Sequence, residues 1–210
     1  MKKKLIARLM QERVVGVRSH EGHFFRADFE HILQGVLLEY VPRGLYVTNF
    51  RFPLFDPAGP HLSYSNRTPG SGFVGKDELS EEELVDHVLS VPALQQSLVI
   101  GPPMSLIQFI DYLPRLQNEY ARLMHAAALI LLRQEDDALQ VMEAIDPKRI
   151  HASQKGNYEL LLTSLRQRSP DALNLLERAR DQNMRAFGCA DPMREGGFVE
   201  RVGKLVRRRK

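Results

Sequence analysis

The period of the hydrophobic pattern changes between residues 67 and 80, and this change limits the fold more than any other feature. Before it, apolar residues form short runs over 32–41 and 45–52, and alternate residues from Tyr46 to Phe52 would share one face of a strand. After it, apolar residues recur at the spacings of three and four that are typical of helices. We therefore expect an α+β fold in which a β-rich part precedes a helical part.

The β-rich part, residues 1–78, is expected to contain one helix over about 3–13 and a small antiparallel sheet of three to four strands. The turn sequence Pro42-Arg43-Gly44 separates the two apolar runs, so these runs are expected to pair as a hairpin. A further strand is expected over 61–66. Pro53 should lie at a strand end or edge, because proline has no amide hydrogen for the sheet.

The helical part, residues 79–210, is expected to hold about five antiparallel helices and to end in a basic tail. Ser80 with Glu83 forms a capping box, and Ser105 with Gln108 has the same spacing. Other predicted helix boundaries are starts at Pro114, Asp136 or Asp137, Ser153 and Ser169, and an end at Gly188. The two parts can form two domains or one continuous domain.

The segment from Tyr120 to Ile145 has small and large apolar residues at helical spacing, interrupted by one short turn. Its alanines would let two helices approach closely, and it resembles a helical hairpin of tetratricopeptide type. No second copy follows at the period of about 34 residues that such repeats have, so a repeat array is not expected.

Charge is distributed unevenly along the chain, although the net charge is only +3. Residues 1–18 and 194–210 are basic, which leaves an acidic body between them. Consecutive cations at the C-terminus attract phosphate or acidic protein. The candidate residues for binding nucleic acid or an acidic partner are Lys204, Arg207, Arg208, Arg209 and Lys210.

The densest cluster of metal-ligand residue types is His20, Glu21 and His23, with Asp28 nearby. His20, His23 and Asp28 could hold zinc or another divalent ion, and Glu21 could then act as a general base. The spacing is one residue short of the His-Glu-x-x-His helix motif, and Gly22 lies inside it. A polar turn before a strand explains the same residues without a metal.

Two other motifs favour no catalytic chemistry. The motif Gly70-x-Gly72-x-x-Gly75 does not fit a dinucleotide site, because the next helix begins too many residues later. It does not fit a P-loop either, because Asp77 stands where a P-loop has Ser or Thr. A flexible connection is therefore expected. Cys189 follows a predicted helix end, where the negative end of the helix dipole would raise its pKa, so it is a poor nucleophile. No catalytic residues and no cofactor are therefore predicted.

Residues 44–57 (GLYVTNFRFPLFDP) and 61–67 (HLSYSNR) resemble a motif in a family of uncharacterised bacterial proteins. In that family an aromatic strand ends in Pro-Leu-aromatic-x-Pro, and a His-Leu strand ending in Arg follows. The resemblance implies a shared α+β fold with helices after the sheet. It brings no assigned activity, and hence no functional residues, but such proteins often act as immunity or accessory factors beside bacterial conflict systems.

The expected function is that of a non-enzymatic interaction, accessory or immunity-type subunit whose partner is another protein. The alternative is a nucleic-acid-associated protein or metal-dependent hydrolase that uses the basic ends and the cluster at His20. No stretch approaches the roughly 18 apolar residues of a membrane span, and the apolar run after the N-terminal lysines is too short for a signal peptide. A cytoplasmic location without membrane association is expected, and the sequence leaves the oligomeric state open.

Overall fold

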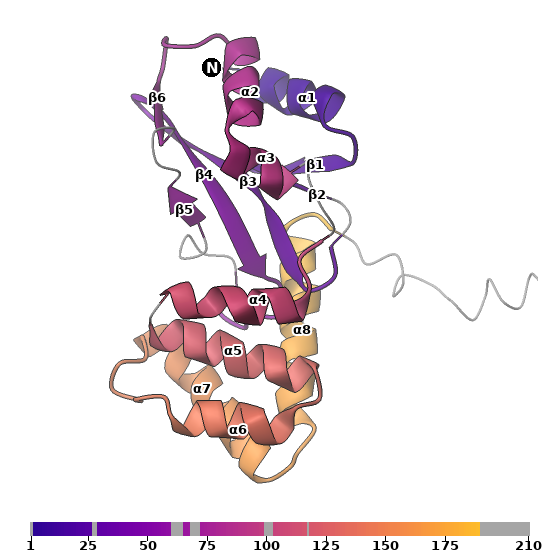
Figure 1. Ribbon diagram of the computed structural model, residues 1–210, viewed down its shortest axis with the longest axis vertical. Helices are drawn as coiled ribbons and strands as arrows, with labels where there is room; N and C mark the ends of the chain where they lie inside the picture. The colour runs from indigo at the N-terminus through magenta and orange to yellow at the C-terminus, as the bar shows by residue number, and fades with distance from the viewer. Residues whose placement is uncertain are drawn as a thin grey trace, which may run out of the picture.

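The computed structural model describes residues 2–26, 29–59, 65–67, 72–98, 103–116 and 118–189. It confirms a mixed α+β fold, with an antiparallel sheet and a body of helices next to it (Figure 1). Within the described residues, no helix combines the length and apolar character needed to span a membrane.

The sheet has more strands than the three to four that were expected. Five strands form an antiparallel path in the order β1-β2-β3-β4-β5, and β6 pairs with another stretch of β4. The strands are β1 (Val17–His20), β2 (His23–Arg26), β3 (Ile32–Val41), β4 (Gly44–Pro53), β5 (Ser65–Arg67) and β6 (Phe73–Gly75). The expected number was wrong because strands of three or four residues are too short to show an alternating pattern.

The long β3–β4 hairpin is the centre of the sheet and confirms the predicted hairpin. Its register runs from Val41 opposite Gly44 to Ile32 opposite Pro53, so only Pro42 and Arg43 form the turn. Pro53 is the last residue of β4, as predicted. The predicted strand over 61–66 is described only at its end, in β5, because residues 61–64 lie outside the described part.

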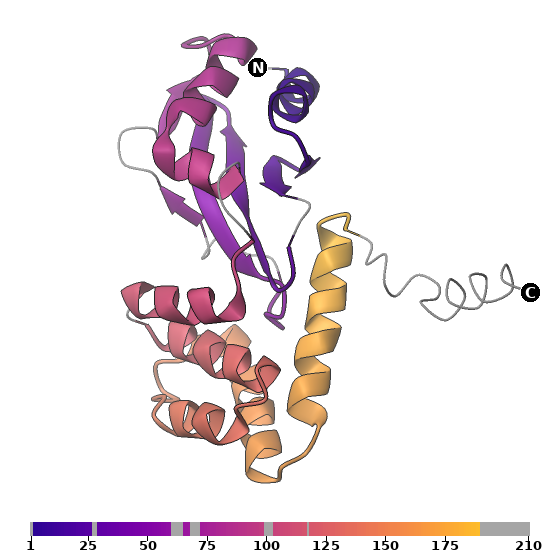
Figure 2. The ribbon, with the colours of Figure 1, turned by 45° about the vertical axis from the view of Figure 1, so that its right-hand side comes forward.

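Different helices cover the two faces of the sheet. One face packs against α1 (Lys3–Arg13), α2 (Glu81–Ser90) and α3 (Pro92–Leu98). The other packs against the C-terminal end of α8 (Asp171–Ala186), which runs beside the sheet in Figure 2. Because both faces are covered, β3 is a nearly continuous apolar run rather than an alternating one. Strand β3 contributes Leu33 and Leu37 to the core on the α8 side of the sheet. It contributes Val36 and Leu38 to the core on the opposite side.

The helical body consists of α4 to α7 and the first part of α8. Its elements before α8 are α4 (Leu106–Tyr112), the 3-10 helix η2 (Leu113–Leu116), α5 (Glu119–Leu131), α6 (Glu135–Glu143) and α7 (Ala152–Arg166). α5 and α6 form the expected helical hairpin, and its buried alanines include Ala127, Ala128 and Ala138. The likeness of this hairpin to the tetratricopeptide type stays a prediction.

The helix boundaries were predicted best where a complete capping motif is present. Both capping boxes exist, because the Ser80 and Ser105 side chains accept from the amides of Glu83 and Gln108, respectively. α8 ends at Ala186, two residues before the predicted Gly188, which follows the C-cap Phe187. The φ of 64° at Gly188 lets the Cys189 amide reach back to the Met184 carbonyl at 2.7 Å.

The helix starts predicted from single residues were mostly wrong. Pro114 lies in η2, and α5 starts instead after Asn118, which caps the amide of Ala121. α6 starts after Gln134 rather than at Asp136 or Asp137. His151, and not Ser153, is the N-cap of α7. At α8 the N-cap is Pro170, while the predicted Ser169 accepts from the Asp171 amide at 3.2 Å.

The segment after β4 joins the sheet to the helical body. Leu54 packs with the α8 face of the sheet, whereas the next residue, Phe55, packs in the helical core. Asp56 is fully buried and accepts from the Tyr120 hydroxyl at 2.7 Å and the Ala58 amide at 2.8 Å. Two hydrogen bonds from the Asn183 side chain then attach this segment to α8. We call Asp56, Tyr120 and Asn183 the polar junction.

Candidate binding site at the N-termini of α5 and α7

The first turns of α5 and α7 open into one cavity of about 530 Å³, which we call the helix-end cavity. α5 contributes Asn118 and Glu119, and α7 with its preceding turn contributes Arg149, His151 and Gln154. The remaining lining residues are Ala58, Tyr120, Leu123, Ile150 and Ser153. Half of the lining residues lie in the two helices, and the others come from the helix caps, the turn before α7 and the segment after β4.

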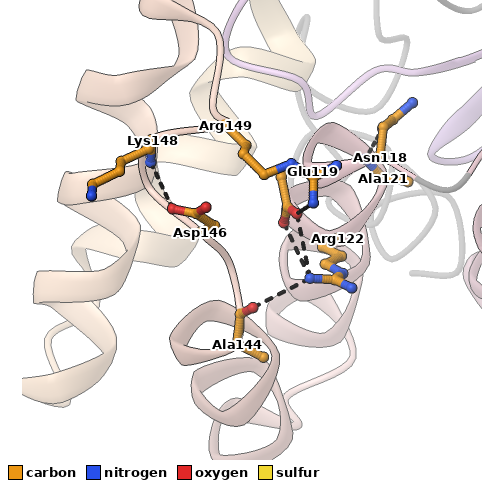
Figure 3. Close-up of polar contacts among 8 residues, drawn as sticks. All are labelled: Asn118, Glu119, Ala121, Arg122, Ala144, Asp146, Lys148 and Arg149. Atoms are coloured by element: carbon orange, nitrogen blue, oxygen red, sulfur yellow. Dashed lines mark hydrogen bonds and ion pairs between the residues drawn. The ribbon is translucent and has the colours of Figure 1, made fainter.

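A buried carboxylate between two arginines is the main electrostatic feature of this site (Figure 3). Glu119 is only 5% exposed, and Arg122 Nη1 lies 3.3 Å and 3.4 Å from its two carboxylate oxygens. Arg149 Nη1 lies 3.5 Å from Glu119 Oε1. Pairing is needed because an unpaired buried charge is strongly destabilising. The side chains of Arg122 and Arg149 are 55% and 66% exposed, so both guanidinium groups also face solvent.

A tight turn positions Arg149. The carbonyl of Asp146 accepts from the Arg149 amide at 3.0 Å, and its side chain accepts from the Lys148 amide at 3.0 Å. Asp followed by Pro147 is a common opening of a β-turn, because the side chain bonds its own backbone and proline presets φ. Ile150 is buried directly after the turn, which anchors Arg149 at the mouth of the cavity.

A second cavity of about 380 Å³ adjoins the same ion pairs. It shares Asn118, Glu119 and Arg149 with the helix-end cavity and is also lined by Arg122 and His125. Burial lowers the pKa of His125 below its ordinary value, since burial disfavours the imidazolium form. Arg122 Nη1 also donates to the Ala144 carbonyl at the end of α6 at 3.3 Å, so the same nitrogen contacts both helices of the α5–α6 hairpin.

Gln154 is the one lining residue with an unexplained polar atom. It is 5% exposed, and its Oε1 has no hydrogen-bond partner in the described part of the chain. Buried side-chain polar atoms are usually hydrogen-bonded. This oxygen has almost no accessible surface, so it does not face the cavity.

Tyr120 is part of the cavity wall, and its side chain is unsuited to proton transfer. Burial, followed by the negative charge of Asp56 and the hydrogen bond between the two side chains, raises the pKa of Tyr120 well above its ordinary value. The phenol therefore stays protonated and holds the polar junction together.

The predicted metal residues His20 and His23 face each other across the β1–β2 hairpin. Glu21 and Gly22 form its two-residue turn, with positive φ angles of 44° and 86°. His23 Nδ1 contacts the His20 carbonyl oxygen, and its ring packs edge-on against Phe50 and Phe187. The described residues contain no group of three potential metal ligands, and Asp28 lies outside them. The metal site stays a prediction.

The turn also brings His20 and Glu21 next to the N-terminal lysines. Together with Lys3 and Lys4, these residues line a cavity of about 460 Å³ between α1 and the β1–β2 hairpin. Lys3 Nζ lies 4.5 Å from the centre of the Tyr40 ring, and burial raises the pKa of Tyr40 to about 12. The structure thus brings part of the predicted cluster together with part of the basic N-terminus.

The other predicted features are only partly described. The candidate binding residues Lys204 and 207–210 lie outside the described part of the chain, as do residues 68–71 of the Gly-rich segment. The later part of that segment, Phe73–Gly75, is strand β6. Cys189 is buried, and this burial raises its pKa, which agrees with the predicted direction although the main cause is desolvation.

Sequence reasoning missed the residues of the helix-end cavity. The spacing of Glu119 and Arg122 is a recognisable i, i+3 pair, but such pairs are common on exposed helix faces. Nothing local connects Arg149 or Gln154 to that pair, because the contact forms only when the turn before α7 comes against the start of α5. In comparisons with protein-family models, with curated proteins and with solved structures, nothing matches this chain.

Proposed function

We propose that this chain is a non-enzymatic accessory or immunity-type subunit of a bacterial system, and that it binds another protein through the helix-end cavity. The observation that carries this proposal is a cavity built on two helix ends, whose lining includes the exposed Arg149 and the polar side chains of Asn118 and His151. Pre-formed cavities with a few convergent polar groups are typical binding sites.

The chemistry of the lining supports binding rather than catalysis. Glu119 is enclosed by ion pairs with Arg122 and Arg149, and the raised pKa of Tyr120 keeps its phenol protonated. General acid–base catalysis favours groups with a pKa near the working pH. The cavity residues instead offer fixed hydrogen-bond donors and apolar walls, which suit recognition.

The architecture of the helical body also supports a binding role. The close-packed alanines of the α5–α6 hairpin resemble those of tetratricopeptide-type hairpins, and helical arrays of that kind present extended binding surfaces. The site lies at one end of this hairpin, where Arg122 and Ala144 hold its two helices together.

Site-specific photocrosslinking in the native host tests the proposal. A photoreactive amino acid at His151, an exposed cavity residue, should yield a discrete adduct with one protein, and Arg149→Glu in the same chain should abolish it. The matched control position is Glu159, which is exposed on the same helix but does not line the cavity. Equal adducts from both positions, or an adduct that survives Arg149→Glu, would contradict the proposal.

The alternative function is nucleic-acid binding, or metal-dependent hydrolysis, through the basic ends and the cluster at His20. The observation in its favour is the cavity that joins Lys3 and Lys4 to His20 and Glu21. A salt-sensitive shift of DNA or RNA that disappears on deletion of residues 204–210 would support it. Elemental analysis without stoichiometric metal would remove its hydrolase form.

A further inference from the structure

Strand β6 lies at an outer edge of the sheet (Figure 1). Within the described residues it pairs only with β4, with Phe73 opposite Tyr46 and Gly75 opposite Gly44. An edge strand presents backbone N–H and C=O groups without a partner in the sheet, and these groups can pair with a strand of another chain. Natural proteins usually carry a feature that prevents such pairing.

The hydrogen bonds on either side of β6 show which of its residues face outward. The Gly72 carbonyl accepts from an amide of β4 at 3.2 Å, and the Lys76 amide donates to a carbonyl of the β3–β4 turn at 3.0 Å. Along an antiparallel strand, successive residues direct their backbone groups alternately toward the partner strand and away from it. Phe73 and Gly75 therefore direct their backbone groups away from the sheet.

Glu78 occupies both outward groups of Gly75. Its carboxylate oxygen Oε2 accepts from the Gly75 amide at 2.7 Å, and its own amide donates to the Gly75 carbonyl at 3.2 Å. Glycine leaves room for this contact, because a Cβ atom at position 75 would lie 3.2 Å from the same carboxylate oxygen. Of the outward groups of β6, only those of Phe73 are left for pairing with another strand.

Phe73 gives this edge an apolar surface that would favour association if the backbone groups were open. Its side chain is 46% exposed, and its ring packs beside the Tyr46 ring with a centroid distance of 5.1 Å. An edge strand that is both apolar and exposed is the kind that associates most readily. The hydrogen bonds of Glu78 therefore occur where the sheet has most need of them.

We infer that Glu78 is an intramolecular cap that keeps the β6 edge closed, and that its removal lets β6 pair with β6 of a second copy of this chain. A strand that pairs antiparallel with its own copy is related to it by a twofold axis, so one edge supplies both halves of the interface. The cap acts through its hydrogen bond to the Gly75 amide and not through repulsion by its charge. This surface is separate from the helix-end cavity, so the inference does not depend on the proposed function.

Sedimentation velocity of the purified full chain, from about 10 µM to about 500 µM, tests this inference. We expect Glu78→Ala to self-associate with a dissociation constant on the order of 100 µM, because the Gly75 amide becomes available beside the Phe73 groups. NMR of the ¹⁵N-labelled chain locates the interface. The amides of Phe73 and Gly75 should shift with protein concentration in Glu78→Ala and should stay constant in the unaltered chain.

Three further variants separate the hydrogen bond from the charge. Glu78→Gln should behave like the unaltered chain, because its side-chain oxygen can still accept from the Gly75 amide. The matched control is Glu82→Ala, which removes the same charge from an exposed position on α2 and should not cause association. Adding Phe73→Asp to Glu78→Ala should abolish the association, because it places a charge on the open edge.

Hydrogen exchange in the unaltered chain tests the cap without any substitution, and it decides the matter if Glu78→Ala does not fold. Relative to their intrinsic rates, the Gly75 amide should exchange about tenfold or more slowly than the Phe73 amide, since only the Gly75 amide is hydrogen-bonded.

Four outcomes would overturn the inference. They are equal protection of these two amides, a folded Glu78→Ala that stays monomeric, association of Glu78→Gln or Glu82→Ala as strong as that of Glu78→Ala, and association that leaves the Phe73 and Gly75 amides unshifted.

Discussion

At the scale of single residues, the polar junction determines how the segment after β4 is held. Asn183 is 3% exposed, and its side-chain nitrogen donates to the carbonyls of Leu54 and Asp56 at 2.7 Å and 2.8 Å. The Asp56 side chain in turn accepts a hydrogen bond from the Tyr120 hydroxyl. Buried polar groups of this kind contribute modestly when paired and cost much more when one partner is removed.

We expect Asn183→Ala to lower the free energy of unfolding by about 2–4 kcal/mol, because two buried carbonyl groups lose their donor. Urea denaturation followed by circular dichroism measures this change. Asn174→Ala is the control, since Asn174 is exposed on the same helix, and it should change stability by less than about 0.5 kcal/mol. Equal effects of the two substitutions would contradict the role given to Asn183.

His23 makes the stability of the fold depend on pH. Burial lowers its pKa below the ordinary value of 6.5, so the unfolded chain binds a proton more readily than the folded chain. Stability therefore rises with pH in this range: the contribution of neutral His23 is present above pH 6.5 and is lost as the pH falls through the folded-state pKa.

We expect His23→Phe to reduce this pH dependence, because Phe can keep the edge-on contacts with Phe50 and Phe187 without titrating. The measurement is the urea midpoint of both proteins at intervals between pH 7.5 and 5. Some dependence should remain, since burial also lowers the pKa of His31 and His125. Parallel curves for the two proteins would show that His23 does not contribute.

At the scale of elements, local capping determines where α2 begins. Ser80 accepts from the Glu83 amide at 3.2 Å, and the Glu83 side chain accepts from the Ser80 amide at 2.8 Å. These two hydrogen bonds satisfy donors that the helix itself cannot pair. Leu84, Val85 and Val88 follow at once and pack against the sheet, so the cap sets the register of a helix that covers one of its faces.

We expect Ser80→Ala to destabilise the protein by about 1 kcal/mol, since the cap acceptor is lost while the apolar face of α2 is unchanged. Chemical denaturation gives this value. Ser90→Ala is the matched control at the other end of α2, where the hydroxyl only donates to the His87 carbonyl, and it should cost less. A larger loss for Ser90→Ala than for Ser80→Ala would rule out the assigned cap.

At the scale of the whole molecule, α8 connects the sheet and the helical body. Ala172 and Leu176 in its first half belong to the helical core, whereas Met184 in its second half and Phe187 directly after it belong to the core on the sheet. Figure 2 shows this helix extending from the body to the sheet. A rigid helix that is buried in both cores should couple their unfolding.

We expect Leu176→Ala to destabilise both parts together by about 2–5 kcal/mol, the usual cost of such a buried cavity. Hydrogen exchange followed by mass spectrometry would then show faster exchange in β3 and β4 as well as in α5 and α7. Leu160→Ala, at a 40% exposed position on α7, is the control and should leave the sheet unaffected. Faster exchange in the helical body alone would mean that the two parts unfold independently.

Local signals in the sequence determined the long elements and the fold class. The alternating run of β4, its proline-containing turn and the complete capping boxes at Ser80 and Ser105 act over a few neighbouring residues, so they could be recognised without the fold. The short strands β1 and β6 were missed, since they have too few residues for a pattern. They form because pairing with a neighbouring strand supplies their hydrogen bonds.

Only the tertiary structure determined the candidate site. Glu119 is buried and paired because the turn before α7 brings Arg149 against the start of α5. Asp56 lies in a motif that was recognised in the sequence, but its partners Tyr120 and Asn183 come from distant helices. Local propensity acts within a few residues, whereas burial and ion pairing depend on which elements pack together. For this reason the sequence alone determined the long elements, and the packing of the turn before α7 against the start of α5 determined the cavity.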